Sequence, residues 1–328
     1  MITVLSGGVG GAKLVHGLAT VLPDPGSLTV VANTADDCEI WGLHVSPDVD
    51  TVLYTLAGLA SPERGWGIEG DTWAALEMLD RYGAPTWFQI GDRDLATHLA
   101  RTMWLREGQR LTEVTARLAR RLGVRSTVLP MSDDPVRTVV HTPAGRLPFQ
   151  EYFVRRRAAD PVLGVEFDGL ATARPSPEVL AALRDARVVI VAPSNPVVSI
   201  GPILALPGVR EALRGTSAVR IAVTPLVQGR AIKGPAAEML QGLGMAATPA
   251  TIADLYHDFL DLFVLDVRDQ SAAASIEAAH ASPRHLRVVC VDTVMPDIPS
   301  RTRLARDLLE RILALGVDLP IPRSVLPG

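Results

Sequence analysis

The chain has 328 residues, of which 48% are hydrophobic and 21% charged, and its formal net charge at neutral pH is −4. These values are typical of a globular protein with a large core, and they exclude a general basic surface for nucleic acid. The two cysteines, Cys38 and Cys290, form neither a disulfide framework nor a zinc pattern. No apolar run reaches the roughly 20 residues of a membrane span and no signal peptide is visible, so we expect a cytoplasmic protein without a membrane partner.

The chain begins with a short apolar strand at residues 2–5, followed by a glycine-rich turn and an apolar helix pattern. This order is typical of a phosphate cradle, because free N–H groups at a helix start face the anion and glycine permits close approach and positive φ. The Walker loop and the dinucleotide motif both fail at Lys13, so a nicotinamide dehydrogenase is disfavoured, as is a purely structural turn. The candidate phosphate-binding residues are Ser6, Gly7, Gly8, Gly10, Gly11 and Lys13.

Acidic residues follow the second predicted strand, residues 28–33. Asp36 and Asp37 come first, and Asp48 and Asp50 follow in a segment that we expect to be extended, with both carboxylates on one side. Carboxylates beside a phosphate cradle repel the phosphate unless a cation lies between them, and hard oxygen ligands favour Mg²⁺. We predict Asp37 and Asp50 as the metal ligands, ahead of Asp36 and Asp48; an ordinary solvated loop is the alternative.

Strands and helices alternate along most of the remaining chain. The pattern predicts helices at 71–82, 94–106, 113–122, 178–184, 209–213, 235–243, 251–257, 272–281 and 301–315, and strands at 86–90, 126–129, 137–142, 162–167, 188–192, 218–224, 262–265 and 286–291. Such alternation predicts an α/β fold with a doubly wound, mostly parallel Rossmann-like sheet, in which ligands bind beyond the carboxyl ends of the strands. We assign residues 1–130 and 174–328 to this nucleotide-binding domain and 131–173 to a smaller, irregular α+β insertion or subdomain. The Pro-rich tail, 318–328, is expected to be extended.

Polar residues also follow the later strands. Asn195 is held between prolines, which suits recognition of a base or ribose, and Lys233 can offset phosphate charge. The arginines at 155–157 can border an anionic ligand, pack at an interface or remain solvated. The histidines show no metal spacing and no nucleophile elbow is present, so covalent catalysis is not indicated.

Taken in order, these motifs resemble one family. The segments are 6–13, 33–37, SPDVDTVLY (46–54), WGIEGDT (66–72), GDRDLATH (91–98), PMSD (130–133), FQEYF (149–153), PSNPVVSIGPIL (193–204) and KGP (233–235). They resemble the 2-phospho-L-lactate transferase family of coenzyme F420 biosynthesis, in its actinobacterial phosphoenolpyruvate transferase form. Two departures are Ala35, where the family has glycine, and Gln228-Gly229-Arg230, where it has a glycine pair.

The resemblance implies an enzyme that transfers a phosphoenolpyruvyl or 2-phospho-L-lactyl group from a guanosine-diphospho donor to the ribityl hydroxyl of the deazaflavin FO. The products would be (dehydro-)F420-0 and GMP, with Mg²⁺ as cofactor and a homodimer as the assembly. Asp37 and Asp50 would be catalytic. The cradle residues, Asn195 and Lys233 would bind the donor, and Asn33, Thr34, Asp50 and Thr51 the acceptor. The alternative is a nucleotide-sugar-binding regulatory protein of a related glycine-loop branch, but SPDVDTVLY and GDRDLATH favour the transferase.

Overall fold

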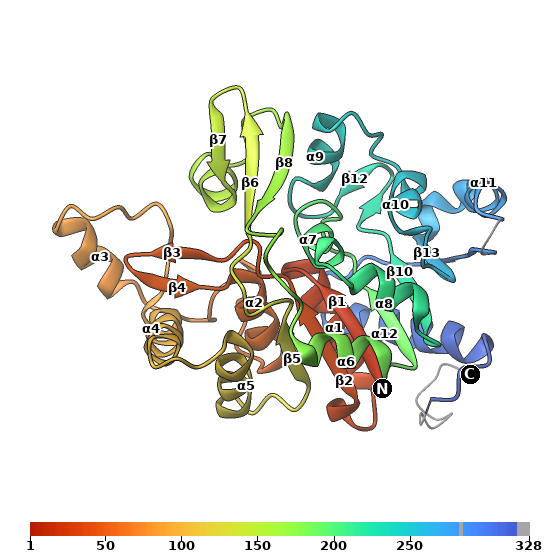
Figure 1. Ribbon diagram of the computed structural model, residues 1–328, viewed down its shortest axis with the longest axis horizontal. Coiled ribbons are helices and arrows are strands. Elements are labelled where there is room, and N and C mark those ends of the chain that lie inside the picture. The colour runs from red at the N-terminus through yellow and green to blue at the C-terminus, as the bar shows by residue number, and fades with distance from the viewer. Residues whose placement is uncertain (282–284, 320–328) are drawn as a thin grey trace.

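A sheet of seven parallel strands forms the centre of the computed structural model, which describes residues 1–281 and 285–319. Its order is β14-β13-β10-β9-β1-β2-β5 (Figure 1). The strands are β1 (Ile2–Ser6), β2 (Leu28–Ala32), β5 (Thr127–Pro130), β9 (Val188–Val191), β10 (Val219–Val223), β13 (Leu262–Asp266) and β14 (Arg287–Val291). This confirms the predicted doubly wound α/β fold. The chain runs outward from β1 through β2 and β5 and then returns to β9, so the strand order reverses between β1 and β9. Ligands of such sheets bind at that reversal.

Helices cover both faces of the sheet, and each face has its own apolar core. One core packs α1 (Val9–Val21), α2 (Pro47–Leu56), α5 (Leu111–Arg121) and α12 (Ile298–Ala314). The other packs α6 (Pro177–Arg184), α7 (Ile200–Ala205), α8 (Val209–Gly215), α9 (Ala236–Gly242), α10 (Pro249–Tyr256) and α11 (Ala273–Ala279). Every residue of β9 is buried, as expected for a central strand covered on both faces.

Smaller units lie outside the main sheet. The strands β6 (Arg137–Thr142), β7 (Gly145–Pro148) and β8 (Gly164–Asp168) form an antiparallel sheet. A π-helix, η2 (Glu151–Arg155), lies between β7 and β8 along the chain. They fall within 131–173, but the domain boundaries themselves stay a prediction. The hairpin β3 (Cys38–Ile40) and β4 (Leu43–Val45) projects from the body with α3 (Ala74–Arg81) and α4 (Asp92–Arg106) (Figure 1). Short elements complete the fold: η1 (Pro25–Ser27), η3 (Val267–Ala272), β11 (Leu226–Val227) and β12 (Arg230–Ala231).

The helices α3 and α4 cap each other. The Asp92 carboxylate accepts hydrogen bonds from the N–H groups of Ala74 and Ala75 at 3.0 and 2.9 Å, at the start of α3. The Asp71 carboxylate accepts from the N–H groups of Arg93 and Asp94 at 2.9 and 3.0 Å, in the first turn of α4. Each helix start is therefore satisfied by an acid that precedes or opens the other helix.

Two of the predicted local structures are wrong. The segment that holds Asp48 and Asp50 is not extended but forms the first turn of α2. Pro47 occupies the first helical position, acids in a first turn complement the helix dipole, and Val49, Val52 and Leu53 are buried at helical spacing. The predicted strand at 86–90 is irregular, because Trp87 and Phe88 pack against the β3–β4 hairpin rather than in a sheet.

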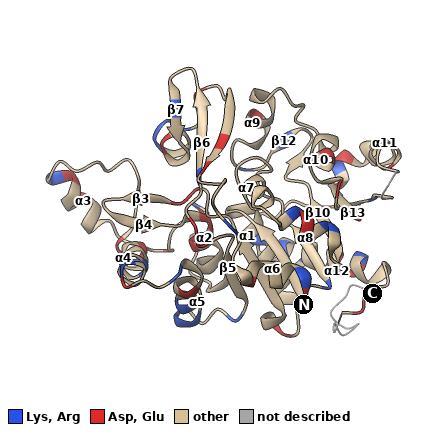
Figure 2. Cartoon of the chain, in the orientation of Figure 1, with Lys and Arg blue, Asp and Glu red and all other residues tan. Residues whose placement is uncertain are grey.

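The described helices are all too short or too polar to cross a membrane. Most of the tail predicted to be extended, from residue 320 onward, lies outside the described residues. Lysines and arginines are mixed with acids over the elements, and α5 carries a local basic run (Figure 2). That run consists of Arg117, Arg120 and Arg121. Arg120 and Arg121 are exposed.

Candidate functional site

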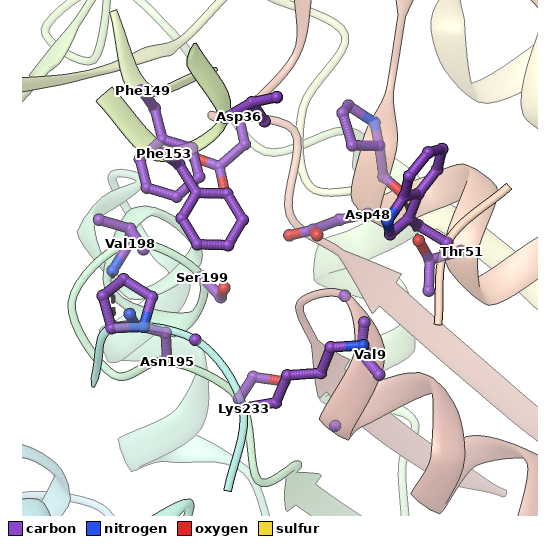
Figure 3. Close-up of a pocket in the computed structure, with 18 of the residues that line it drawn as sticks. Val9, Asp36, Asp48, Thr51, Phe149, Phe153, Asn195, Val198, Ser199 and Lys233 are labelled. Carbon is purple, nitrogen blue, oxygen red and sulfur yellow. Dashed lines mark hydrogen bonds between the residues drawn. The ribbon is translucent and has the colours of Figure 1, made fainter. Parts of the chain in front are cut away.

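A cavity of about 800 Å³ opens at the carboxyl ends of β1 and β9, where the strand order reverses. Figure 3 shows its walls: Val9 from the glycine turn, Asp36 and Asp48 from the acidic segments, and Asn195 and Ser199 after β9. Phe149 and Phe153 lie beside Asp36, and Lys233 closes the lower side. This volume is in the range of small-molecule sites.

The glycine turn packs closely against other walls of the cavity, and its glycines do not adopt the left-handed conformation. Glycine permits both close approach and positive φ, and none of the cradle glycines has positive φ. They are needed for close approach instead. A Cβ on Gly8 would lie 2.6 Å from Asp48 Oδ1, and one on Gly10 would strike the Pro193 carbonyl oxygen. Gly8, Val9 and Gly10 line the cavity, so the N–H groups at the start of α1 are available to an anion.

The other predicted cradle residues lie behind this surface. Ser6 is fully buried, and its hydroxyl donates to the Gly7 carbonyl at 2.8 Å. The Gly7 N–H donates to Ser194 Oγ at 3.0 Å, which ties β1 to the loop after β9. A Cβ on Gly11 would meet the Ser6 and Ser194 hydroxyls. Ser6, Gly7 and Gly11 therefore shape the cradle without lining the cavity.

Two lysines reach the cavity at the cradle. Lys13 Nζ donates to the Met295 carbonyl at 2.9 Å, and Lys233 Nζ donates to the Arg64 carbonyl at 2.6 Å. Burial, with the nearby charges of Arg301 and Lys233, lowers the pKa of Lys13. Because each ammonium group keeps further N–H donors, both lysines remain able to bind phosphate oxygens.

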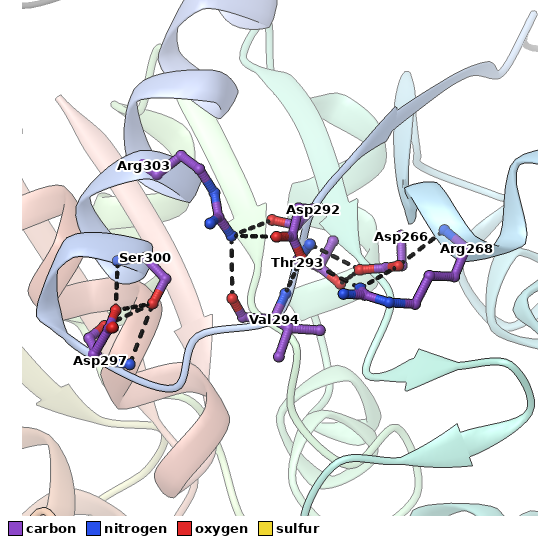
Figure 4. Close-up of polar contacts among 8 residues, drawn as sticks. All are labelled: Asp266, Arg268, Asp292, Thr293, Val294, Asp297, Ser300 and Arg303. Atoms are coloured by element: carbon purple, nitrogen blue, oxygen red, sulfur yellow. Dashed lines mark hydrogen bonds and ion pairs between the residues drawn. The ribbon is translucent and has the colours of Figure 1, made fainter.

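The carbonyl that holds Lys13 belongs to a loop fixed by a buried acid (Figure 4). Asp266, at the end of β13, is fully buried and accepts from both the N–H and the hydroxyl of Thr293 at 2.9 Å. Arg268 donates to the same carboxylate at 2.7 Å. On the other side of the loop, Arg303 of α12 donates to the Val294 carbonyl at 3.2 Å. Residues of β13 and α12 thus fix the loop whose carbonyl accepts the hydrogen bond of Lys13.

Asp36 and Asp48 are the carboxylates that face the centre of the cavity (Figure 3). Burial, followed by the charge of Asp48, raises the pKa of Asp36 well above its ordinary range. Burial raises the pKa of Asp48 to about 7, although a hydrogen bond from Asn33 opposes the rise. The Asn33 amide donates to Asp48 Oδ2 at 3.0 Å and to the Val198 carbonyl at 3.3 Å. Asn33 therefore positions Asp48 and does not itself line the cavity.

Asp37 and Thr34, both predicted site residues, point elsewhere. Asp37 Oδ2 accepts from the Ser46 hydroxyl at 2.8 Å and lies 2.9 Å from His44 Nε2. Asp37 and Thr34 are buried outside the cavity lining. The geometry favours Asp36 over Asp37 as the acid that meets a ligand.

Asp50 lines the cavity, but its carboxylate is bound to Arg101 of α4. Arg101 has no exposed side-chain surface; its Nη1 donates to Asp50 Oδ2 at 3.0 Å, and its Nη2 to Oδ1. Although burial opposes it, the Asp50 charge raises the pKa of Arg101. Both oxygens of Asp50 are thereby engaged and its carboxylate is oriented, which makes it a poor candidate for a metal ligand.

A chain of buried groups supports this ion pair. His98 Nδ1 lies 3.2 Å from Arg101 Nη1, and His98 Nε2 lies 3.3 Å from Asp94 Oδ1. The Tyr54 hydroxyl donates to Asp94 Oδ1 at 2.7 Å. Although burial raises it, hydrogen bonds from His98 and Tyr54 hold the pKa of Asp94 below its ordinary value. Sequence reasoning missed Arg101 entirely, since it lies 51 residues from Asp50.

The two remaining predicted residues line the cavity with part of their polar atoms in use. Asn195 Oδ1 accepts from the N–H groups of Val197 and Val198 at 2.9 and 3.3 Å, which leaves mainly its amide nitrogen for a ligand. The Thr51 hydroxyl donates to the Pro47 carbonyl at 2.8 Å. Aromatic side chains that the prediction omitted form much of the apolar wall: Tyr54, Trp66, Trp87, Phe88, Phe149 and Phe153.

A divalent cation fits beside Asp36 and Asp48. Within the described residues, no cluster of three or more His, Cys, Asp or Glu side chains is arranged to hold a metal. Asp36 Oδ1, however, is buried without a hydrogen-bond partner in the described structure, and the two neighbouring acids raise each other's energy in the ionised form. An oxygen-liganded ion that takes its other ligands from a bound diphosphate suits this donor set.

Comparisons with known proteins agree on one family. The family model of 2-phospho-L-lactate transferase CofD matches residues 2–300. The chain is 38% identical to the 2-phospho-L-lactate transferase of Methanosarcina mazei, over 94% of this chain and 99% of the relative. It is 40% identical to the phosphoenolpyruvate transferase of Kitasatospora aureofaciens, over 94% and 96%. The crystal structure of a UPF0052 family protein from Bacillus halodurans is similar with a TM-score of 0.62 at 17% identity, covering 95% and 98%; this shows a shared fold.

Proposed function

Because the chain belongs to the 2-phospho-L-lactate transferase family, we propose that it carries out this transfer on a deazaflavin. The donor is a guanosine diphosphate that carries a phosphoenolpyruvyl or 2-phospho-L-lactyl group. The acceptor is the ribityl hydroxyl of FO, and the products are (dehydro-)F420-0 and GMP.

One observation supports this function most directly. A single cavity brings together the glycine cradle, the acid pair Asp36 and Asp48, the fixed carboxylate of Asp50 and an aromatic wall. A diphosphate suits the cradle and a planar ring system suits the wall. Two substrates can therefore meet in one space, as a transfer between them requires.

The chemistry requires positioning and charge neutralisation more than covalent help. The acceptor oxygen forms a bond to the β-phosphorus and releases its proton to solvent, and the bond from this phosphorus to the bridging oxygen breaks, so that GMP leaves with the bridging oxygen. Gly8, Gly10 and Lys13 would hold the phosphates. Asp50, held in place by Arg101, would accept the hydrogen bond of the ribityl hydroxyl and orient its oxygen.

Mg²⁺ is the proposed cofactor, with Asp36 and Asp48 as the residues that would hold it. When bound, the ion supplies positive charge between the carboxylates and the diphosphate. This assignment replaces Asp37, which lies outside the cavity lining, and Asp50, whose two oxygens are bound by Arg101.

A direct test incubates the protein with FO, Mg²⁺ and each donor, and measures the mass of the deazaflavin product. We expect a mass gain of one substituted phosphate with at least one donor, together with release of GMP. No gain with either donor refutes the proposal, and tight binding of a nucleotide-sugar in its place would favour the regulatory alternative.

We also propose the homodimer that the family resemblance implies. Large apolar side chains are exposed on and beside α3 and α4: Met78, Tyr82, Leu99 and Met103. Light scattering of the purified protein measures its mass in solution, and a monomer at micromolar concentration would contradict the proposal.

A further inference from the structure

The arginine run at 155–157 divides into two kinds of residue. Arg155 Nη1 lies 3.2 Å from Glu151 Oε1, and Arg156 donates to both oxygens of Asp160 at 2.5 and 2.6 Å. Arg157 lines the cavity, and no hydrogen bond or ion pair engages its guanidinium among the described residues. Three adjacent residues of one charge thus have different surroundings.

The backbone turns at this point in an unusual way. The π-helix η2 ends at Arg155, and Arg157 and Ala158 then adopt φ values of 55° and 50°. A left-handed conformation is uncommon for residues with a Cβ, and both features are frequent at functional sites. The Ala158 N–H donates to the Tyr152 carbonyl at 2.9 Å, which holds the turn in place.

Among the lysines and arginines that line the cavity, Arg157 is also the one without a hydrogen-bond or ion-pair partner in the described part of the chain. Lys13 and Lys233 donate to carbonyls beside the cradle. Arg64 donates to the Ile68 carbonyl at 2.9 Å and lies over the rings of Trp66 and Trp73. The guanidinium of Arg157 is therefore the cation whose donors are all available to a ligand.

The segment that carries Arg157 is joined to the acid pair. Gln150 Nε2 donates to the Asp36 carbonyl at 2.9 Å, and Phe149 and Phe153 stack with ring centres 5.4 Å apart beside Asp36. In the proposed reaction the β-phosphate lies between the cradle and this pair. The group esterified to that phosphate, with its carboxylate, would then extend toward the segment 149–157.

We propose that Arg157 recognises the carboxylate of the group being transferred. A planar guanidinium matches a carboxylate in a two-point hydrogen bond, and the phosphates already have the cradle and two lysines. The inference rests on the proposed function. It gives the enzyme a means to distinguish its donor from other esters of guanosine diphosphate in which the esterified group has no carboxylate.

The test compares two donors that differ only in this carboxylate. One is guanosine diphosphate esterified through the hydroxyl of lactate, and the other is the ethyl ester of guanosine diphosphate, in which a hydrogen replaces the carboxylate. The wild-type protein should prefer the lactyl donor by roughly ten- to hundred-fold in kcat/KM, the value of one charged hydrogen-bond pair. In Arg157→Gln the kcat/KM for the lactyl donor should fall while that for the ethyl ester stays unchanged, so that the preference is lost. Arg155→Gln and Arg156→Gln are matched controls that should keep it.

Other results would overturn the inference. They are an unchanged preference in Arg157→Gln, or an equal loss with both donors, which would place Arg157 on the phosphates. Calorimetric binding of both donors without FO gives the same comparison when no turnover occurs. Absence of turnover in the wild type refutes the proposed function, whereas the ratio of the two donor affinities still tests Arg157.

Discussion

Replacement of Arg101 by methionine tests the central electrostatic claim about the site. The side chain of Arg101 has no exposed surface, and that of Asp50 is 6% exposed. Methionine keeps much of the length but removes both hydrogen bonds to the carboxylate and leaves its charge buried. Loss of one partner of a buried ion pair costs about 3–5 kcal/mol, so the unfolding free energy should fall by that amount at pH 7.

A double-mutant cycle in urea measures the effect. Arg101→Met with Asp50→Asn removes the charge as well as its partner, so most of the lost stability should return. Arg125→Met is the matched control: its 2.8 Å pair with Asp24 is exposed, and its loss should be about 0–1 kcal/mol. Equal losses in the two variants, or no recovery in the double variant, would refute the reasoning.

Three further predictions concern the donor side. The pKa of Asp48 is raised, so the contribution of Asp48 to stability falls as the pH rises from about 4 through about 7. Mg²⁺ should therefore raise the melting temperature, measured by scanning fluorimetry, more at pH 8 than at pH 5. Asp48→Asn should abolish this difference. Gly8→Ala should raise the donor KM by displacing Asp48, whereas Gly215→Ala, with open space around its Cβ, should not; equal kinetics would count against close approach. Lys13→Ala should weaken donor binding by about ten-fold and FO binding little, and a parallel loss of both in titrations would argue against the cradle.

The sheet could be predicted from the sequence because its strands are continuous apolar runs with helices between them. The apolar strand at 188–192 and the strand that precedes the glycine turn are the two strands on either side of the point where the strand order reverses. The helix α2 was missed although its signals were present: Pro47 at the first position and buried Val49, Val52 and Leu53 at helical spacing.

The site was harder to predict, because its key relations are between distant segments. The sequence places acids after β2 but cannot show that Asp37 turns toward Ser46 and His44 while Asp36 faces the cavity. Arg101 lies on α4, three residues beyond the end of the motif GDRDLATH (91–98). The glycines at the turn are visible in the sequence, but the close contacts of Gly8 with Asp48 and of Gly10 with Pro193 are revealed only by the assembled fold.

The mutual caps of α3 and α4 have a consequence for how the protein opens. No residue of α3 is buried, so this helix contributes little packing of its own. Because Asp92 opens α4 and also satisfies the start of α3, fraying of either helix removes a cap from the other. The two helices should exchange their amide hydrogens as one cooperative unit. Since α4 also carries Arg101 and His98, helix α3 and the buried ion pair between Arg101 and Asp50 share a single opening equilibrium.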